Sequence, residues 1–189
     1  MSPVRRWLYT AAVLIATPAA ALSPEALASL EAQREGDMTR LVFHETPKER
    51  VEVPFTDGDG GAVSFADFAG DIVFVNFWAT WCPPCLKEMP SIDRLAAEMG
   101  DEMAVVAVST DRGDIAKPRR WMAENGIETL ALYHDNGLRT ARAAAILGQP
   151  TTLILDREGR EIARFQGDTE WDSPEALALL RAIVAETAP

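Results

Sequence analysis

Residues 72–85 read IVFVNFWATWCPPC, and this stretch decides the fold of the chain. Its first part is almost continuously apolar and β-branched or aromatic, which is typical of a strand covered on both faces of a sheet. Two cysteines follow, and then a helical pattern from about residue 83 to residue 99, with an expected break or bend at Pro90. The sequence therefore predicts a central buried strand that leads directly into a cysteine pair at the start of a helix.

Strand and helix patterns alternate on both sides of this unit. Strands are expected at 41–43, 51–55, 103–108, 130–133, 151–155 and 161–166, and helices at 25–35, 116–125 and 139–147, with a last helix after Ser173. The glycine-rich segment 57–61 reads as a hairpin turn. Strands alternating with helices, followed by a closing hairpin, predict an α/β fold with a mixed sheet and an antiparallel edge.

Composition and charge limit the possible functions. The 189 residues are 48% hydrophobic and 25% charged, which is typical of a globular chain with a proper core. Eighteen basic residues face 29 acidic ones, giving a net charge of -11. A protein that follows phosphates needs the opposite sign on its working face, so we expect no nucleic-acid partner.

The N-terminus has the layout of a secretory signal. Arg5 and Arg6 precede an apolar stretch at 7–16, and a run of alanines follows Pro18. The apolar stretch is about ten residues long, whereas a spanning helix needs roughly 20. We therefore expect residues 1–22 to be a cleaved signal peptide, with a retained N-terminal anchor as the alternative. Export places the cysteines in a compartment that keeps disulfides oxidised.

The two cysteines of the chain, Cys82 and Cys85, are suited to redox chemistry. A helix N-terminus favours thiolate over thiol, and Cys82 is placed to cap the helix. Pro83 and Pro84 have no N–H, so Cys85 supplies the first backbone donor that reaches the Cys82 sulfur. We expect a less strongly lowered thiol pKa than in a motif with one proline. Cys82 fits the attacking role and Cys85 the resolving role in thiol–disulfide exchange.

Three segments together resemble the thioredoxin-like proteins of the TlpA, ResA and CcmG group. They are FWATWCPPC at 77–85 with EMP at 88–90, GQPTTLILD at 148–156, and EWDSPE at 170–175, the last most similar to the TlpA branch. The resemblance covers about residue 51 to the C-terminus. It implies a periplasmic thioredoxin-like fold with a mixed central sheet flanked by helices, an N-terminal β extension and a central insertion. We accordingly divide the rest of the chain into an N-terminal extension at 23–50 and a thioredoxin-like domain at 51–189.

The same resemblance implies an enzyme activity and partners. It implies a dithiol that reduces disulfides of exported client proteins, in cytochrome c maturation or in copper-site assembly for cytochrome oxidase. A membrane thiol-electron donor would keep the dithiol reduced, because the compartment is oxidising. No cofactor is expected, and we expect a monomer.

Site residues follow position by position from the resemblance. Cys82 and Cys85 match the redox pair, and Pro150 matches a cis-proline that faces it, with a strand-edge proline as the alternative. The Gln149 backbone would then meet an extended client segment as an added strand. Glu88 matches a glutamate tied to proton handling in ResA-like members and lies three residues after Cys85 on the same helix face. The alternative for Glu88 is a solvated side chain.

Aromatic and polar residues near the motif complete the expected site. Many thioredoxins carry a buried aspartate where this chain has Asn76, and an asparagine cannot act as a general base. The proton of the resolving thiol must therefore go to water or to Glu88. Trp81 is expected to be partly exposed and, with Pro83 and Pro84, to contact the client, whereas Trp78 is expected in the core. Trp171 lies near the active surface or packs before the last helix.

Two other functions remain open at this point. A Cu(I) carrier could use Cys82, Cys85 and His134, since soft thiolates select Cu(I), although copper-delivery relatives usually have a wider cysteine spacing. An oxidase of the DsbA kind normally has a histidine between its cysteines, where this chain has Pro83 and Pro84. A zinc site is disfavoured because zinc takes four ligands and His44 and His134 lack paired spacing, so no metal is expected.

Overall fold

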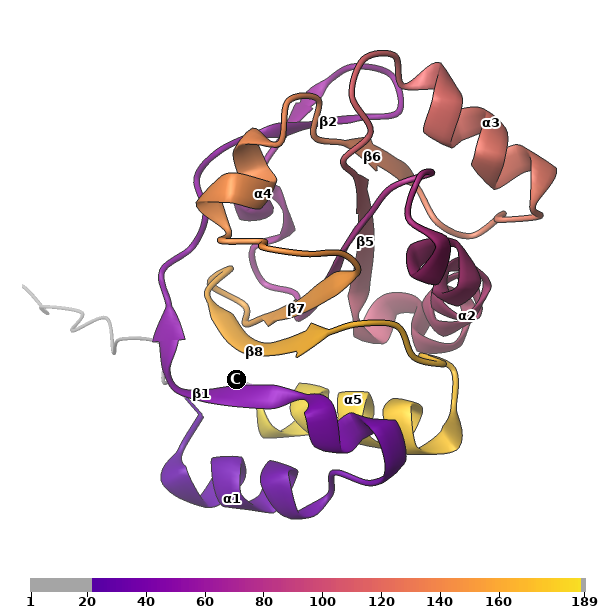
Figure 1. Cartoon of the computed structure of the whole chain (residues 1–189). Helices are drawn as coiled ribbons and strands as arrows, with labels where there is room; N and C mark the ends of the chain where they lie inside the picture. Colours follow the sequence, from indigo (N-terminus) through magenta and orange to yellow (C-terminus); the bar gives the residue numbers. More distant parts are fainter. Residues whose placement is uncertain (1–21, 188–189) are drawn as a thin grey trace, which may run out of the picture.

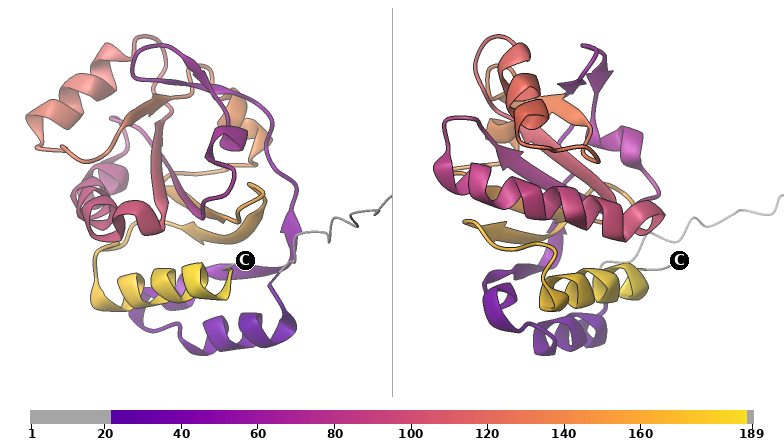
Figure 2. Two further views of the ribbon diagram at one scale, coloured as in Figure 1. Left: turned by 180° about the vertical axis from the view of Figure 1, so that it is seen from behind. Right: turned by 90° about the vertical axis from the view of Figure 1, so that its right-hand side faces the viewer.

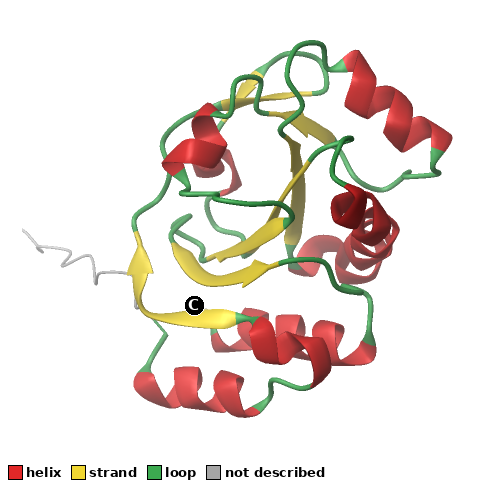
Figure 3. Cartoon of the chain, viewed as in Figure 1, coloured by secondary structure: helices red, strands yellow, loops and turns green. Residues whose placement is uncertain are grey.

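One mixed sheet of eight strands, in the order β1-β8-β7-β4-β5-β6-β2-β3, forms the centre of the molecule (Figures 1 and 3). The strands are β1 Val42–Lys48, β2 Phe55–Asp57, β3 Ala62–Val63, β4 Val73–Trp78, β5 Ala104–Ser109, β6 Leu132–His134, β7 Thr151–Leu155 and β8 Glu161–Gln166. Strand β4 pairs parallel with β5, and β5 parallel with β6, while the other neighbours are antiparallel. The mixed α/β sheet expected from the sequence is thus confirmed.

The computed structural model describes residues 22–187, so residues 1–21 of the expected signal segment lie outside the described range. Its helices are α1 Pro24–Ala32, α2 Pro83–Met99, α3 Ala116–Glu124, α4 Arg139–Ala143 and α5 Pro174–Glu186, with 3-10 turns η1 Gly36–Arg40, η2 Phe65–Phe68 and η3 Gly100–Glu102. Within this range, no helix combines the length and the hydropathy that a bilayer crossing requires.

Side chains of β4 alternate between the two faces of the sheet, and both faces are covered by a hydrophobic core. Phe74 and Trp78 point into the core under α1, α2 and α5, while Val75 and Phe77 point into a second core under α4 and η2. Asn76 shares the face of Phe74 and Trp78, because strand side chains alternate with a period of two. The sequence of β4 therefore places one buried polar residue beneath α2.

The N-terminal residues 23–50 belong to the same core as the rest of the chain. Strand β1 pairs with β8 and so extends the sheet at one edge. Helix α1 packs against α5 and β1, and the two helices lie side by side in Figures 1 and 2. Leu30, Met38 and Leu41 are fully buried in the core that also contains α2 and α5. These contacts make the extension part of the packing of the thioredoxin-like domain.

Helices α1 and α5 both start at a capping serine. The Ser23 hydroxyl accepts the Ala26 N–H at 3.0 Å, and the Ser173 hydroxyl accepts the Ala176 N–H at 3.3 Å. In both helices a proline follows the capping serine. The short sequence Ser-Pro-Glu is therefore a helix start used twice.

Several expected element boundaries differ from the structure; for example, the strand expected at 41–43 runs from Val42 to Lys48, and the helix expected at 25–35 ends at Ala32. Only Phe55 of the strand expected at 51–55 is in a strand, because residues 49–54 cross from β1 at one edge of the sheet to β2 near the other and pair with no strand. Helix α4 ends at Ala143 instead of Leu147, since Ala145 has a left-handed φ of 52°. Of the break or bend expected at Pro90, the break is wrong, because α2 continues through Pro90 with Met89 and Ile92 fully buried.

Candidate active site

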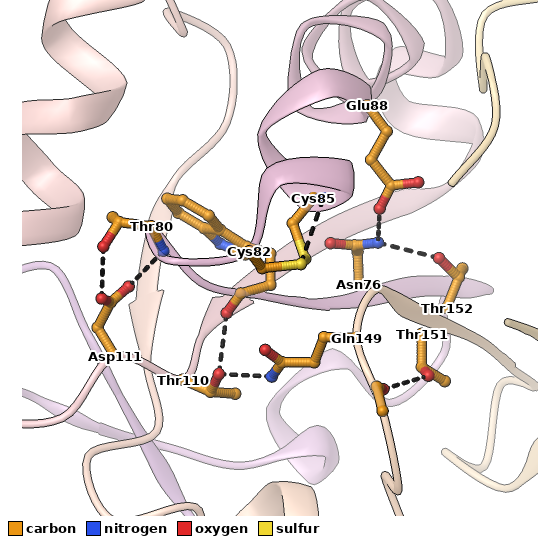
Figure 4. The surroundings of a disulfide bond; sticks show 12 residues. Asn76, Thr80, Cys82, Cys85, Glu88, Thr110, Asp111, Gln149, Thr151 and Thr152 are labelled. Atoms are coloured by element: carbon orange, nitrogen blue, oxygen red, sulfur yellow. Dashed lines mark hydrogen bonds between the residues drawn. A yellow bond between two sulfur atoms is a disulfide. The ribbon is translucent and has the colours of Figure 1, made fainter. Parts of the chain in front are cut away.

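The cysteine pair lies where β4 passes into α2, and it is closed as a disulfide (Figure 4). Cys82 is the N-cap residue of α2, and its Sγ accepts the Cys85 N–H at 3.3 Å, as the double proline predicts. The two Cα atoms are 5.3 Å apart. Cys82 is 4% exposed and Cys85 is fully buried, so Cys82 is the outer sulfur but is less exposed than expected of an attacking group.

Exposed side chains surround this outer sulfur. Trp81 is 61% exposed, and Pro83 and Pro84 are exposed as well. Trp78 is fully buried, with its ring centroid 5.4 Å from that of Trp121. The expected division between an exposed Trp81 and a core Trp78 is confirmed.

Glu88 is buried behind the disulfide, so the alternative of a solvated side chain is wrong. It is 1% exposed, on the face of α2 that packs onto β4. Its Oε1 accepts the Asn76 amide N–H at 2.8 Å, and its Oε2 accepts the Trp171 indole N–H at 3.2 Å and the Thr169 backbone N–H at 3.4 Å. Strand β4, helix α2 and the segment before α5 thus each contribute to one polar cluster within the core.

The environment of Glu88 favours its neutral form. Burial is the largest effect and raises the pKa of Glu88 to about 7, against the opposing effect of the hydrogen bonds from Asn76, Trp171 and Thr169. No described Lys, Arg or His forms an ion pair with the carboxyl group. Glu88 is therefore a carboxyl group that titrates near neutrality inside the protein.

Asn76 connects this cluster to the cysteine side of the site. Its amide nitrogen also donates to the Thr152 hydroxyl at 3.0 Å on β7. Its amide oxygen is buried and has no hydrogen-bond donor among the described residues. In the view of Figure 4, the Asn76 side chain lies between the sulfur atoms and Glu88, with its nitrogen toward Glu88 and its oxygen on the side of the sulfurs.

Trp171 is a buried packing residue, the second of the two alternatives that the sequence left open, and it also contacts Glu88. Its ring is fully buried and packs edge-on against Phe74 at 4.7 Å and Phe165 at 5.0 Å between ring centroids. Its backbone N–H donates to the Ser91 hydroxyl at 3.1 Å, while its indole N–H is held by Glu88. One residue therefore packs beneath the last helix and contacts the buried acid.

The loop before β7 carries Gln149 and Pro150, the two other residues expected in the site. The Gln149–Pro150 peptide bond is cis, and Pro150 is buried. The Gln149 side chain donates to the Thr110 hydroxyl, which in turn donates to the Trp78 carbonyl at 3.0 Å (Figure 4). Thr110 thereby joins the Gln149 loop to the end of β4.

Asp111 fixes the segment that precedes Cys82, and the sequence reasoning missed it. Its carboxylate accepts the Thr80 N–H at 2.8 Å and hydrogen bonds from the Thr80 and Ser109 hydroxyls. Burial opposes its charge, but the hydrogen bonds from Thr80, Lys117 and Ser109 outweigh that effect and lower the pKa of Asp111. A usable signal existed, because β4 and β5 are parallel and the polar residues after both strands meet at one edge of the sheet.

Residues 22–187 do not gather a metal site. No group of three His, Cys, Asp or Glu side chains in this range is arranged to hold a metal ion, so Cys82, Cys85 and His134 do not form the proposed Cu(I) ligand set. The Nε2 atom of the His134 ring lies 2.7 Å from the Asp111 carbonyl oxygen. The copper-carrier alternative therefore receives no support from the arrangement of these residues.

Comparisons with known proteins agree on the chemistry of the site. The Redoxin family profile matches residues 44–180. The thiol-disulfide oxidoreductase ResA of Bacillus thuringiensis subsp. konkukian is 29% identical over 135 residues, which are 71% of this chain and 77% of that protein. The thiol:disulfide interchange protein HelX of Rhodobacter capsulatus is 33% identical over 135 residues, covering 68% of this chain and 70% of HelX.

Solved structures are similar in fold. A Chlorobium tepidum protein assigned as the thiol:disulfide interchange protein DsbE superposes with a TM-score of 0.63 at 25% identity, over 76% of this chain and 99% of that one. A secreted thiol-disulfide isomerase from Corynebacterium glutamicum has a TM-score of 0.65 at 18% identity, over 78% and 92% of the two chains. The second likeness concerns the fold alone.

Proposed function

The chain belongs to the Redoxin family and is a thiol-disulfide oxidoreductase, and on this premise we propose that it reduces disulfides in exported client proteins. The observation that carries the exchange chemistry is the buried Glu88, with a pKa of about 7, behind the Cys82–Cys85 pair, while the reducing direction is taken from the resemblance of the motifs. A reductant must remove the proton of its resolving thiol inside a water-poor site. An acid–base group is most effective there when its pKa lies near the working pH.

The exchange proceeds in two displacements. The Cys82 thiolate attacks one sulfur of the client disulfide, so that this bond breaks, a Cys82–client disulfide forms, and the departing client thiolate takes up a proton. The Cys85 thiolate then attacks the Cys82 sulfur and releases the second client thiolate, which is also protonated. Two electrons pass to the client, and the protein ends as the Cys82–Cys85 disulfide.

Glu88 accepts the proton that Cys85 loses before the second displacement. Asn76 cannot do so, because an amide is not a base at neutral pH. The Asn76 amide instead holds the Glu88 carboxyl by a 2.8 Å hydrogen bond and thereby positions it. The pKa of about 7 supports this assignment, since a group of that pKa both accepts and returns a proton near neutral pH.

The client segment binds over the loops on either side of the disulfide. Trp81, Pro83, Pro84 and the Gln149–Pro150 backbone form this surface in the proposal. Trp81 and Leu147, at 61% and 92% exposure, are two of the three large apolar side chains exposed within the described range, and they belong to these two loops. We propose Trp81 as the apolar anchor of this surface, because it directly precedes the reactive Cys82 and an exposed aromatic ring suits contact with a partner.

The biological setting follows from the N-terminal signal and from the resemblance of the motifs. We propose export into the periplasm through residues 1–22, with the anchor as the alternative, and action as a monomer on clients of cytochrome c maturation or copper-site assembly. A membrane thiol-electron donor would restore the dithiol after each turnover, because an oxidising compartment does not supply electrons.

The reduction potential of the Cys82/Cys85 pair tests the proposed direction. The purified protein is equilibrated with glutathione or dithiothreitol buffers, and the fraction of disulfide is measured. A potential toward the roughly -270 mV of thioredoxin is the expected result for a reductant. A potential near the roughly -120 mV of DsbA would make the protein an oxidant and overturn the proposal.

A further inference from the structure

A pocket of about 470 Å³ opens next to the residues that carry the disulfide, and of its lining only Trp81 has a part in the exchange described above. Its lining consists of Trp81, Thr110, Asp111, Arg112, Lys117 and Leu138. Trp81 directly precedes Cys82, and Thr110 is bonded to Gln149, so the pocket borders both loops of the proposed docking surface. A volume of this size lies within the range of small-molecule binding pockets, so the pocket has room for a client side chain.

Of the two basic side chains in the lining, one has an ion-pair partner and the other has none among the described residues. Lys117 Nζ lies 3.1 Å from the buried Asp111 carboxylate, so these two charges compensate each other. The Arg112 guanidinium is exposed and has no hydrogen bond or ion pair to any described residue. Asp114, the nearest exposed carboxylate along the chain, accepts the Ala116 N–H at 2.8 Å. The pocket therefore presents one uncompensated positive charge at its rim.

This positive charge stands out in an acidic protein. Residues 111–142, which contain most of the pocket lining, carry six basic and five acidic side chains, whereas the whole chain carries 18 and 29. The general field of the protein attracts basic clients, so a local preference for acidic groups here would have to come from the pocket itself.

The apolar part of the lining suits the stem of a side chain. Trp81 and Leu138 contribute apolar surface to the pocket, and Leu138 has a left-handed φ of 62°. Such a backbone conformation is uncommon for residues other than glycine and is found disproportionately at ligand sites. Asp135 holds this turn, because its carbonyl accepts the Leu138 N–H at 3.1 Å and its carboxylate accepts those of Arg139 and Ala141.

We propose that this pocket selects clients that carry an acidic residue close to the cysteine under attack, with the acidic side chain's stem between Trp81 and Leu138 and its carboxylate on Arg112. A guanidinium binds a carboxylate through two parallel hydrogen bonds, which gives the contact both strength and orientation. The inference rests on the proposed reduction of client disulfides and adds the chemical class of the preferred client.

Three peptides of identical length test this preference. Each is closed by one intramolecular disulfide, and they differ only in the two residues that flank the first cysteine, which are Glu, Gln or Lys. The rate constant for reduction by the dithiol form of the protein is measured at low ionic strength, where charge effects are least screened. We expect the Glu peptide to be reduced about tenfold faster than the Lys peptide.

Two variants separate the pocket from the overall charge. Arg112→Glu is expected to reverse the order, so that the Lys peptide reacts faster than the Glu peptide. Arg181→Glu changes the net charge by the same amount, but it lies on α5, which packs with α1 beside β1. This control variant is expected to keep the wild-type order of the three peptides. Equal rates for all three peptides, or equal changes in both variants, would overturn the pocket proposal alone. Wild-type protein that reduces none of the peptides would overturn the proposed function and this inference with it.

Discussion

The Asn76 amide nitrogen lies 2.8 Å from Glu88 Oε1, and both side chains are buried between β4 and α2. Glu88 thus has three N–H donors, from Asn76, Trp171 and Thr169, and no described cation. Neutral donors stabilise a buried carboxylate only partly, because they supply no full opposite charge. The pair therefore places a titratable group in the core whose charge state changes near pH 7.

Glu88→Gln is expected to remove a pH dependence of stability. The pKa of Glu88 is raised from its ordinary 4.5 to about 7 in the fold, so the native state binds the proton more tightly than the unfolded chain. The contribution of protonated Glu88 to the free energy of unfolding is complete below about pH 4.5 and is lost as the pH rises through 7. The free energy of unfolding thereby falls by about 3 kcal/mol. Denaturant unfolding of the oxidised protein at several pH values gives the free energy of unfolding of wild type and of the variant. The difference between the two values, followed against pH, measures this contribution.

The matched control for this measurement is Glu98→Gln, on the exposed side of the same helix. It should follow the wild-type pH dependence throughout. A difference between wild type and Glu88→Gln that stays constant from pH 4 to pH 9 would show that the fold does not shift the pKa of Glu88 from its ordinary value.

Exchanging the two partners of the hydrogen bond tests whether Glu88 acts as the base. Glu88→Gln is expected to slow client reduction by roughly 10²-fold, which is the lower end of the contribution of general acid–base groups. Adding Asn76→Asp to that variant returns a carboxyl group to the same buried pair and should recover part of the rate. Stopped-flow tryptophan fluorescence over a pH range measures the rate of client reduction by both variants. The plot of rate against pH should have no inflection near pH 7 in the single variant.

Two results of that exchange would contradict the proton-acceptor role. One is an unchanged rate and pH profile in Glu88→Gln. The other is a double variant no faster than the single one although its unfolding transition matches that of wild type, since a carboxyl group would then be present without effect.

Trp171→Phe is expected to move the titration of Glu88 to higher pH. The indole N–H donates to Glu88 Oε2 at 3.2 Å and so stabilises the charged form. Phenylalanine keeps an aromatic ring between Phe74 and Phe165 but has no donor. Hydrogen bonds to charged groups are strong enough to shift the midpoint by roughly one pH unit. Carbon-13 NMR of the Glu88 carboxyl group measures the midpoint, and a shift toward lower pH would contradict the role of the indole.

Cys85→Ser is expected to accumulate a covalent complex with a disulfide-containing client, and Cys82→Ser is not. Cys82 is the outer sulfur at the N-cap of α2, whereas Cys85 is fully buried one turn further in. Without Cys85, the mixed disulfide on Cys82 has no resolving thiol. Non-reducing gels and mass spectrometry detect the complex. Complexes recovered only from the Cys82→Ser protein would reverse the two roles.

Local sequence predicted the central strand and the cysteine site well, because the determining features are adjacent. The apolar run of β4 and the prolines after Cys82 act within a few residues of one another. Burial of Glu88 depends on Trp171 and Thr169, which lie more than 80 positions away and reach α2 only through the turn after β8. No helical pattern around residue 88 indicates this contact.

Errors at element ends have a similar origin. The pattern at 51–55 favours a strand, but a strand needs a paired edge, and this segment crosses between the two edges of the sheet. The early end of α4 depends on a left-handed Ala145, a residue type that gives no such signal. Nearby, the Arg164 side chain donates to the carbonyls of Ala144 and Ala145 at 2.8 and 3.1 Å, a contact across about 20 positions.

Glu161→Gln is expected to loosen the N-terminal strand from the sheet. The Glu161 carboxylate, 7% exposed, lies within 3.0 Å of His44 Nε2, Lys48 Nζ and the Arg164 guanidinium, so it ties β1 to β8. Burial opposes the charge of Glu161, but the hydrogen bonds from Arg164, His44 and Lys48 outweigh it and lower its pKa. Removing one partner of a buried ion pair costs about 3 kcal/mol, because the remaining charges lose their compensation.

The pH dependence of this contact has the opposite sign to that of Glu88. A lowered pKa means that the stabilising effect of Glu161 is present above the ordinary pKa of 4.5 and is lost as the pH falls through the value in the fold. Hydrogen exchange of the β1 amides should be faster in Glu161→Gln at neutral pH, and the gap to wild type should narrow in acid. Glu52→Gln, which removes an exposed partner of Arg50, is the control and should leave the β1 amides as protected as in wild type. If β1 exchanges at the wild-type rate in Glu161→Gln, the β1–β8 pairing and the apolar packing of the extension hold it in place without Glu161.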